Sequence, residues 1–273
     1  MQVVKSLNNS FVHKQKVNAM GAWFEISVLT GDTEIAEQRV KSAVAEIKRV
    51  DKLLTSLGTD SIANQINYNA GIAPVKINGE LYRLIERSLL IAELTQGIFD
   101  ITYGTTASYV NVELNAAHNT VFLKEKGMGI YFGGIAKGYA ADRAKYILQL
   151  NGIDSGVIRT EGSVVAWGLQ TDGSQWTIGE ADALQEQMPY AGHNISNMAV
   201  ASSVKAEMLA GSDISNICIM STSAELSSAM IAPLAKLGIQ KGRQMVDALQ
   251  QLACVFVDQQ GKMHPSKYMA ALN

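Results

Sequence analysis

Gly133-Gly134-Ile135-Ala136-Lys137-Gly138-Tyr139 joins an apolar segment to a run with helical periodicity. We expect a strand over residues 129–132 and a helix from about residue 135 to 150. Glycines at such a turn let the backbone approach a ligand closely, and the N–H groups that open a helix suit a phosphate. Lys137 adds a positive charge to the first turn. The segment predicts either a phosphate-binding turn or an ordinary tight turn.

Apolar patterns in the N-terminal half predict one strand and two helices. Alternating character predicts a strand over residues 20–30, and apolar residues at three- and four-residue steps predict a helix that begins after residue 31. The polar stretch over residues 59–71 is expected to be a loop. A second helix is expected near residues 80–95, with Gly97 as its terminating glycine.

The second half alternates short strands with helices. Residues 121–123 and 129–132 are expected to pair as a hairpin around the turn at 125–127. A helix is expected over residues 224–237, which Pro233 would end or kink. The other expected elements are strands near 155–160, 163–168, 175–180, 196–202, 214–221 and 251–258, and a helix over 239–250.

This order of elements predicts an α+β fold. Strands and helices interleave without βαβ regularity, which favours mixed or antiparallel sheets packed by helices. The sequence contains no internal repeat, low-complexity tract or Pro/Gly-rich linker. We therefore expect a single domain over residues 18–273, preceded by an N-terminal extension over residues 1–17.

Composition excludes several classes of partner. The net charge is −2, with 47% hydrophobic and 18% charged residues, which is ordinary for a globular protein and favours neither nucleic acid nor a membrane surface. No apolar stretch is long enough to span a bilayer, and residues 1–16 lack the apolar run of a signal peptide.

The two cysteines stand in apolar runs. Cys218 and Cys254 are each flanked by apolar residues, which predicts buried free thiols. A disulfide between them remains the alternative and would need facing strands. Their spacing does not suit zinc.

Two further motifs carry candidate ligand contacts. Phe99-Asp100 follows Gly97, where the ring can stack on a planar ligand and the carboxylate can accept a hydrogen bond from it. The alternative is a phenylalanine in the core and an aspartate that caps a turn. For Met20, the alternative to ligand contact is core packing.

Four motifs in order carry a family resemblance: Met20-Gly21-Ala22, residues 97–102, residues 133–139 and Trp176-Thr177-Ile178-Gly179. Together they resemble the FAD:protein FMN transferases, or ApbE-like flavin transferases, over about residues 18–258. The resemblance implies the ApbE-like fold, FAD as ligand, magnesium as cofactor and an acceptor flavoprotein as partner. The positions that it assigns to flavin-nucleotide contact are Met20, Asn67, Ile98, Phe99, Asp100, Tyr131, Gly133, Gly134 and Lys137; Tyr131 stands where the family commonly has an aspartate.

The resemblance also implies export, usually to the periplasm. Because residues 1–16 lack a signal peptide, we expect that the chain has either lost a leader or works in the cytoplasm.

The magnesium positions depart from the family pattern. The family's Ala-Asp-Ala-Leu-Ala-Thr-Ala segment aligns with Ser227-Ser228-Ala229-Met230-Ile231-Ala232-Pro233, so Ser228 replaces the aspartate and Ala232 the threonine. A hydroxyl and a methyl do not supply the hard oxygen donors, usually including a carboxylate, that magnesium needs. Glu225 is an alternative donor from the same segment. Other acids that could rebuild the site are Glu161, Glu207 and Asp213.

No catalytic residue is assigned from the sequence. The four histidines, at positions 13, 118, 193 and 264, match no catalytic position of the family. Three hypotheses follow: a transferase that moves FMN from FAD to a Thr or Ser hydroxyl of a partner flavoprotein, a non-catalytic protein that binds flavin or another nucleotide, or an interaction protein without flavin.

Overall fold

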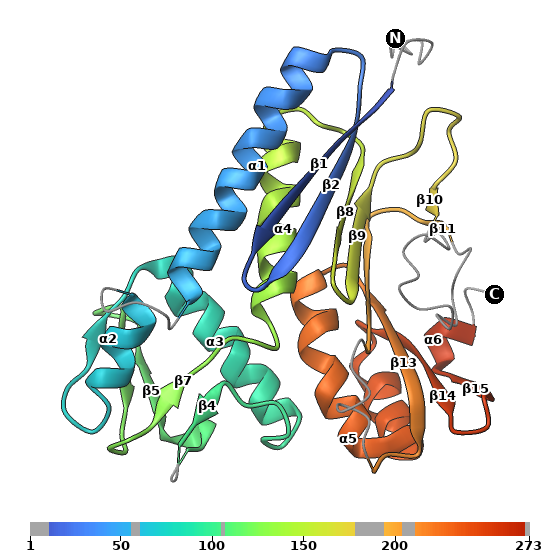
Figure 1. The fold of residues 1–273 in the computed structure, drawn as a ribbon. Coiled ribbons are helices and arrows are strands. Elements are labelled where there is room, and N and C mark those ends of the chain that lie inside the picture. Colours follow the sequence, from blue (N-terminus) through green and yellow to red (C-terminus); the bar gives the residue numbers. More distant parts are fainter. Residues whose placement is uncertain (1–10, 56–60, 105–106, 178–193, 204–210, 271–273) are drawn as a thin grey trace. The chain divides into compact units, whose positions relative to one another are not determined.

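The structure is a computed structural model that describes residues 11–55, 61–104, 107–177, 194–203 and 211–270 (Figure 1). Contacts between Cα atoms divide the chain into two compact units, each described by itself below. The large unit contains residues 1–48 and 137–273, and the small unit contains residues 49–136.

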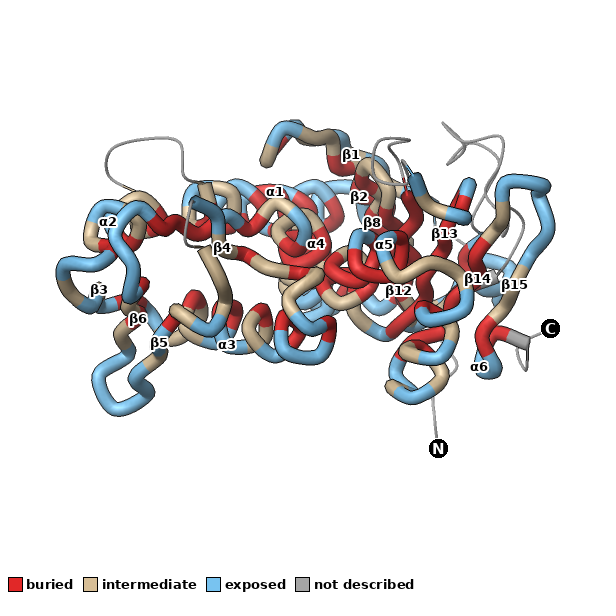
Figure 2. The backbone as a smooth tube through the Cα atoms, turned by 90° about the horizontal axis from the view of Figure 1, so that it is seen from below, coloured by how far each residue is buried: buried red, intermediate tan, exposed pale blue. Residues whose placement is uncertain are grey.

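Helices occur in both units, and buried and exposed residues alternate along them (Figure 2). The helices are α1 (Thr33–Leu54), α2 (Ile62–Tyr68), α3 (Gly79–Leu94), α4 (Ala136–Leu150), α5 (Ala224–Leu249) and α6 (Lys267–Ala270), with a 3-10 turn η1 (Tyr109–Asn111). Each of the helices within the described residues is too short or too polar to cross a lipid bilayer.

The strands are short and pair in an antiparallel manner. They are β1 (Phe11–Ala19), β2 (Ala22–Thr30), β3 (Val75–Lys76), β4 (Thr102–Tyr103), β5 (Val112–Asn115), β6 (Thr120–Leu123), β7 (Gly129–Ile130), β8 (Gly156–Thr160), β9 (Ser163–Trp167), β10 (Trp176–Thr177), β11 (Asn194–Ile195), β12 (Met198–Ser202), β13 (Ile214–Ser221), β14 (Ala253–Asp258) and β15 (Met263–Pro265). Helices packed with antiparallel sheets confirm the α+β prediction.

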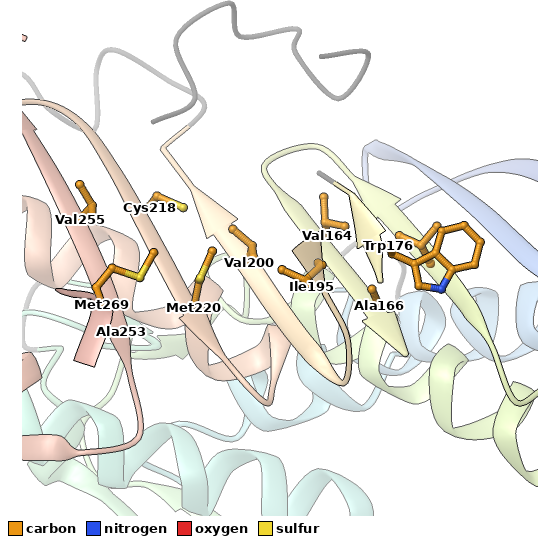
Figure 3. Close-up of a cluster of buried hydrophobic side chains, with 11 residues drawn as sticks. Val164, Ala166, Trp176, Ile195, Val200, Cys218, Met220, Ala253, Val255 and Met269 are labelled. Atoms are coloured by element: carbon orange, nitrogen blue, oxygen red, sulfur yellow. The ribbon is translucent and has the colours of Figure 1, made fainter. Parts of the chain in front are cut away.

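The large unit is built on an eight-stranded sheet in the order β1-β2-β8-β9-β12-β13-β14-β15. Helix α5 packs against β9, β12, β13 and β14. Its Gly242 lies so close to Phe256 of β14 that an added Cβ would be 2.7 Å from the ring. On the other face, Cys218, Met220 and Val255 join an apolar cluster to which α6 contributes Met269 (Figure 3). Both faces of the sheet at β13 and β14 are therefore covered with apolar contacts.

The register of β13 and β14 places the two cysteines on opposite faces of this sheet. Cys218 is directly opposite Val255, and Cys254 is directly opposite Ile219. Because successive residues of a strand point to opposite faces, the two thiols point away from each other. Both are free and buried, as predicted, and burial raises the pKa of each thiol to about 12.

A half-buried carboxylate joins α4 to the start of α5. Asp142 of α4 accepts hydrogen bonds from Ser223 Oγ at 2.8 Å, Ala224 N at 3.1 Å and Glu225 N at 2.9 Å. One turn earlier, a Cβ on Gly138 would overlap the carbonyl group of Ala224. Asp142 thus satisfies N–H groups that have no partner within α5, and Gly138 permits the close approach of the two helices.

The small unit contains a three-stranded sheet in the order β3-β6-β5 and a two-stranded ribbon of β4 and β7. The predicted helix near residues 80–95 is α3, whose first turn is capped by the Asn78 side chain. Gly97 follows it with φ +78°, and its N–H donates to Ala92 O at 2.7 Å. The prediction that this glycine terminates the helix is confirmed.

In the N-terminal half one strand was missed and one loop prediction was wrong. The strand expected over residues 20–30 is confirmed as β2, which pairs with β1 in a hairpin whose turn contains Met20 and Gly21 at φ +54° and +68°. Sequence patterns missed β1 because it is a polar edge strand, largely exposed. The loop expected over residues 59–71 contains α2, because Ser61 caps a turn whose Ala63 and Ile66 are buried.

Two later predictions were also wrong. Strand β6 pairs with β5 and β3, whereas β7 pairs with β4, so residues 121–123 and 129–132 do not form a hairpin with each other. The helices expected over residues 224–237 and 239–250 are confirmed as the two halves of α5, but the break lies at Gly238, at φ +75° and ψ +176°, and not at Pro233. There Asp213 accepts from Ile239 N at 3.2 Å, so a carboxylate starts the second half of the helix.

We predict that Asp142→Ala lowers the free energy of unfolding by about 1–3 kcal/mol, because it leaves buried donors unpaired. Asp154→Ala is the control, since this aspartate is exposed and should change stability by less than about 0.5 kcal/mol. Urea denaturation at neutral pH measures both. Equal stability of the two variants would contradict the role of Asp142.

The pH dependence of stability gives the same comparison a second readout. Burial, the largest effect, raises the pKa of Asp142 above its ordinary value of 3.8, although its hydrogen bonds oppose this. The part of the stability that is linked to protonation of this carboxyl is therefore present below pH 3.8 and is lost as pH rises through the folded-state pKa. Asp142→Asn removes that slope, and denaturation across the acidic range tests it.

Candidate functional site

The predicted residues of the small unit meet at β7. Asn67 Oδ1 accepts from Ile130 N at 2.8 Å, and its Nδ2 donates to Ile130 O at 3.4 Å. The amide therefore pairs with one edge of β7 as a neighbouring strand would. On the other edge, Tyr131 N donates to Ile101 O at 2.7 Å, which ties Tyr131 to the segment that contains Phe99.

Ile98, Phe99 and Asp100 are held by local contacts. Phe99 is 7% exposed, and its ring edge would be 3.6 Å from a Cβ added to Gly134. Asp100 Oδ1 accepts from Thr102 N at 2.8 Å, and Oδ2 accepts from Tyr109 N at 2.9 Å. Ile98 is half-buried. Phe99 is a core residue and Asp100 caps a turn, so their contact with a flavin stays a prediction.

The glycine turn follows β7 and leads into α4. The N–H groups of Ile135 and Ala136 both donate to Phe132 O, at 2.9 Å and 2.8 Å. Within the described residues, the N–H groups of Gly133 and Gly134 donate no hydrogen bond, and Gly134 is exposed. Consecutive unpaired N–H groups at such a turn attract anions.

Gly134 differs from the other glycines of this motif. Its φ is negative or extended, and an added Cβ would make only an ordinary contact with Phe99. At Gly133, by contrast, an added Cβ would be 2.7 Å from Tyr131 Cζ. Gly138 is needed for packing against Ala224. Nothing in the described part of the fold requires a glycine at position 134.

Met20 and Lys137 belong to the large unit. Met20 is half-buried in the β1–β2 turn at φ +54°, a conformation uncommon for a residue with a side chain. Lys137 Nζ lies 3.4 Å from Glu161 Oε2, with 30% and 38% of the two side chains exposed. Glu161 follows β8, in the turn before β9. The ammonium group therefore already has an anionic partner, which is partly open to solvent.

The residues at the magnesium positions do not supply a magnesium site. Ser228 is half-buried and Ala232 exposed, one turn apart on α5. Within the described residues, no group of three His, Cys, Asp or Glu side chains could hold a metal ion.

The alternative acids have other partners. Glu161 pairs with Lys137, and Asp213 caps the second half of α5. The Glu225 side chain is 8% exposed, at the buried start of α5. Glu207 lies outside the described residues. A rebuilt metal site at any of these acids stays without support.

Sequence reasoning missed Tyr103. This residue of β4 is directly opposite Gly129 of β7, and a Cβ on Gly129 would be 2.6 Å from Tyr103 Oη. The hydroxyl oxygen accepts from Asn67 Nδ2 at 3.3 Å. The signal was the glycine within a strand, which often marks a close approach by a neighbouring group.

Curated relatives match part of the sequence, whereas solved structures match nearly the whole fold. A FAD:protein FMN transferase of Treponema pallidum is 29% identical over 154 residues, 45% of this chain and 42% of the relative. One of Klebsiella pneumoniae is 25% identical over 174 residues, 55% of each chain. The matches thus span about half the length of these curated relatives.

Two solved structures share the fold. The ApbE protein of Thermotoga maritima has a TM-score of 0.82 at 20% identity, over 96% of this chain and 99% of that chain. The apo flavinyl transferase ApbE of Pseudomonas stutzeri has a TM-score of 0.80 at 16% identity, over 97% and 98%. The sequence profile of the ApbE family matches residues 20–222, which is more than half of the chain. This chain belongs to the ApbE family.

Proposed function

We propose that this protein binds FAD, with the Gly133-Gly134 turn as a contact for its phosphates. The observation that carries the proposal is Gly134, an exposed glycine that the described fold does not require. Its N–H and that of Gly133 are unpaired donors, which suit the oxygens of a pyrophosphate. Relatives whose names contain FAD support the choice of nucleotide.

Lys137, in the first turn of α4, is proposed as a cation for a phosphate group. Its present partner, Glu161, is partly exposed, and ion pairs of this kind contribute little to stability. A phosphate can therefore replace Glu161 at small cost. The same carboxylate also repels a phosphate that approaches Lys137, so it lowers the affinity for anionic ligands.

The remaining residues that the family resemblance assigns to the flavin nucleotide are proposed to act mainly through the backbone and through packing. Met20 holds an uncommon backbone conformation, which is a feature of functional turns. The glycine turn is held by contacts with β7 and the segment that precedes β4. These contacts come from Asn67, Ile98, Phe99 and Asp100. Their contribution to binding would be positional, since their polar groups already have partners.

FMN transfer to an acceptor flavoprotein is the second candidate function, favoured by the names of the relatives. In that reaction a Thr or Ser hydroxyl oxygen forms a bond to the phosphorus of the FMN half. The pyrophosphate P–O bond breaks, AMP leaves with its electron pair, and the hydroxyl proton passes to a base. Ser228 and Ala232 do not fit magnesium, so no step is assigned to a metal here.

We predict that Gly134→Ala keeps the urea midpoint of the wild type but raises the Kd for FAD about ten- to hundredfold. Hydrogen bonds to charged groups contribute about 1.5–3 kcal/mol, and the added methyl blocks approach to the N–H groups. Isothermal titration calorimetry measures the Kd.

Gly138→Ala is the contrasting variant, since its Cβ would overlap the Ala224 carbonyl. It should lose about 1–3 kcal/mol of stability. If a folded Gly134→Ala variant binds FAD as tightly as the wild type, the glycine turn does not contact FAD. No FAD binding by the wild type would overturn the proposed function and favour an interaction protein.

We predict that Glu161→Gln binds FAD about two- to fivefold more tightly, because it removes a repulsive charge at a partly exposed site. Lys137→Ala should bind FAD more weakly. Both effects should shrink at high salt, and neither should appear with riboflavin, which has no phosphate. Equal effects on riboflavin and FAD would show that these residues do not face the phosphates.

A further inference from the structure

Two tyrosines of the small unit expose their rings on the β4–β7 ribbon. Tyr103 is 50% exposed and Tyr131 is 63% exposed, although their backbones are fixed by strand pairing. Large aromatic rings are usually buried when their backbone is this constrained, because burial of the ring stabilises the fold. These two rings are held in place but left open.

Each ring lies against a glycine. Tyr103 reaches across β7 at Gly129, and its hydroxyl meets the Asn67 amide on the far edge of that strand. The Tyr131 ring turns onto Gly133, where a Cβ would be 2.7 Å from its Cζ. A ring that packs on bare backbone keeps the opposite side free for a second planar group.

The pairing of β4 with β7 sets the distance between the two tyrosines. Tyr103 is opposite Gly129, and Tyr131 is two residues further along the same chain segment, bonded to Ile101. Diagonal neighbours of this kind in an antiparallel pair are about 7–8 Å apart, still within reach of aromatic side chains. One planar ring can therefore contact both tyrosines.

The neighbouring chemistry identifies the ligand class. Tyr131 lies on Gly133, and the unpaired N–H groups of Gly133 and Gly134 begin there. A planar ring on the tyrosines would thus place an attached phosphate group near anion-binding donors. A planar ring next to a phosphate is the chemistry of a nucleotide.

We propose that Tyr103 and Tyr131 form a stacking site for the planar ring of a nucleotide, either the isoalloxazine or the adenine of FAD. This inference rests on the proposed function and assigns the ring contact to exposed tyrosines in place of the buried Phe99. The role of Tyr103 is inferred from the structure alone, since the family resemblance assigns no contact to this position. The role of Tyr131 rests on its aromatic ring, which the aspartate common at this position in the family does not have.

The test compares Leu and Phe variants at both positions. Tyr131→Leu and Tyr103→Leu keep an apolar side chain but remove the ring, and should raise the Kd for FAD about five- to hundredfold, the range for loss of one base–aromatic stack. Tyr131→Phe and Tyr103→Phe keep the ring and should keep the affinity. Tyr68→Leu is the control, since Tyr68 is an exposed tyrosine (70%) on α2.

Gly129→Ala is an independent variant, because it keeps both tyrosines but displaces the Tyr103 ring. Circular dichroism and the urea midpoint establish that each variant is folded. Riboflavin and ADP are titrated separately, and the ligand whose Kd rises identifies the stacked ring.

The outcomes separate the two proposals. If the wild type binds FAD and the Leu variants bind it equally well, the stacking site is wrong and the proposed function stands. If the Phe variants lose as much affinity as the Leu variants, the hydroxyls act and stacking is again wrong. If the wild type binds none of FAD, riboflavin and ADP, the proposed function itself fails.

Discussion

The half-buried carboxylate of Asp142 is the constraint on which the packing of α4 against α5 depends. It gathers a hydroxyl and two backbone N–H groups at the start of α5, where the helix dipole favours a negative charge. Helix α4 begins one residue before Lys137, and α5 contains Ser228 in its second turn. One side chain thus joins the helices that carry Lys137 and Ser228.

The glycine-rich motif combines separate physical requirements within six residues. Gly138 is small because the Ala224 backbone lies against it, and Gly133 because the Tyr131 ring does. Only Gly134 has no such neighbour within the described fold. A motif that looks like one phosphate-binding signature is therefore partly a packing requirement. Without a ligand, the packing of the fold would still require Gly138 but not Gly134.

Much of the fold could be predicted from the sequence, and the failures have two causes. Helices α1, α3 and α4 were predicted from their apolar periodicity, Asn78 caps α3, and Gly97 ends α3 as expected. Strand β1 escaped prediction because a polar edge strand lacks an apolar pattern. The pairing of β7 with β4 depends on tertiary contacts, including the Asn67 amide, that no local pattern encodes.

The candidate site was predictable in its motifs and not in its contacts. Gly134 and Tyr131 were found by position in a motif, whereas Tyr103 was missed because its importance comes from a strand partner. Asp100 illustrates the converse, since a residue selected for a ligand has both carboxylate oxygens engaged by backbone. Local motifs predict which residues to consider, but their contacts and the use of each polar atom are settled by folding.

The placement of the two cysteines has a consequence for the surroundings in which this fold can exist. Since they are the only cysteines in the chain and face opposite sides of a covered sheet, no cross-link can form without unfolding. Oxidising compartments drive disulfide formation and reducing ones prevent it. Because the two thiols of the described fold face opposite sides of the sheet, this fold does not depend on a disulfide between them.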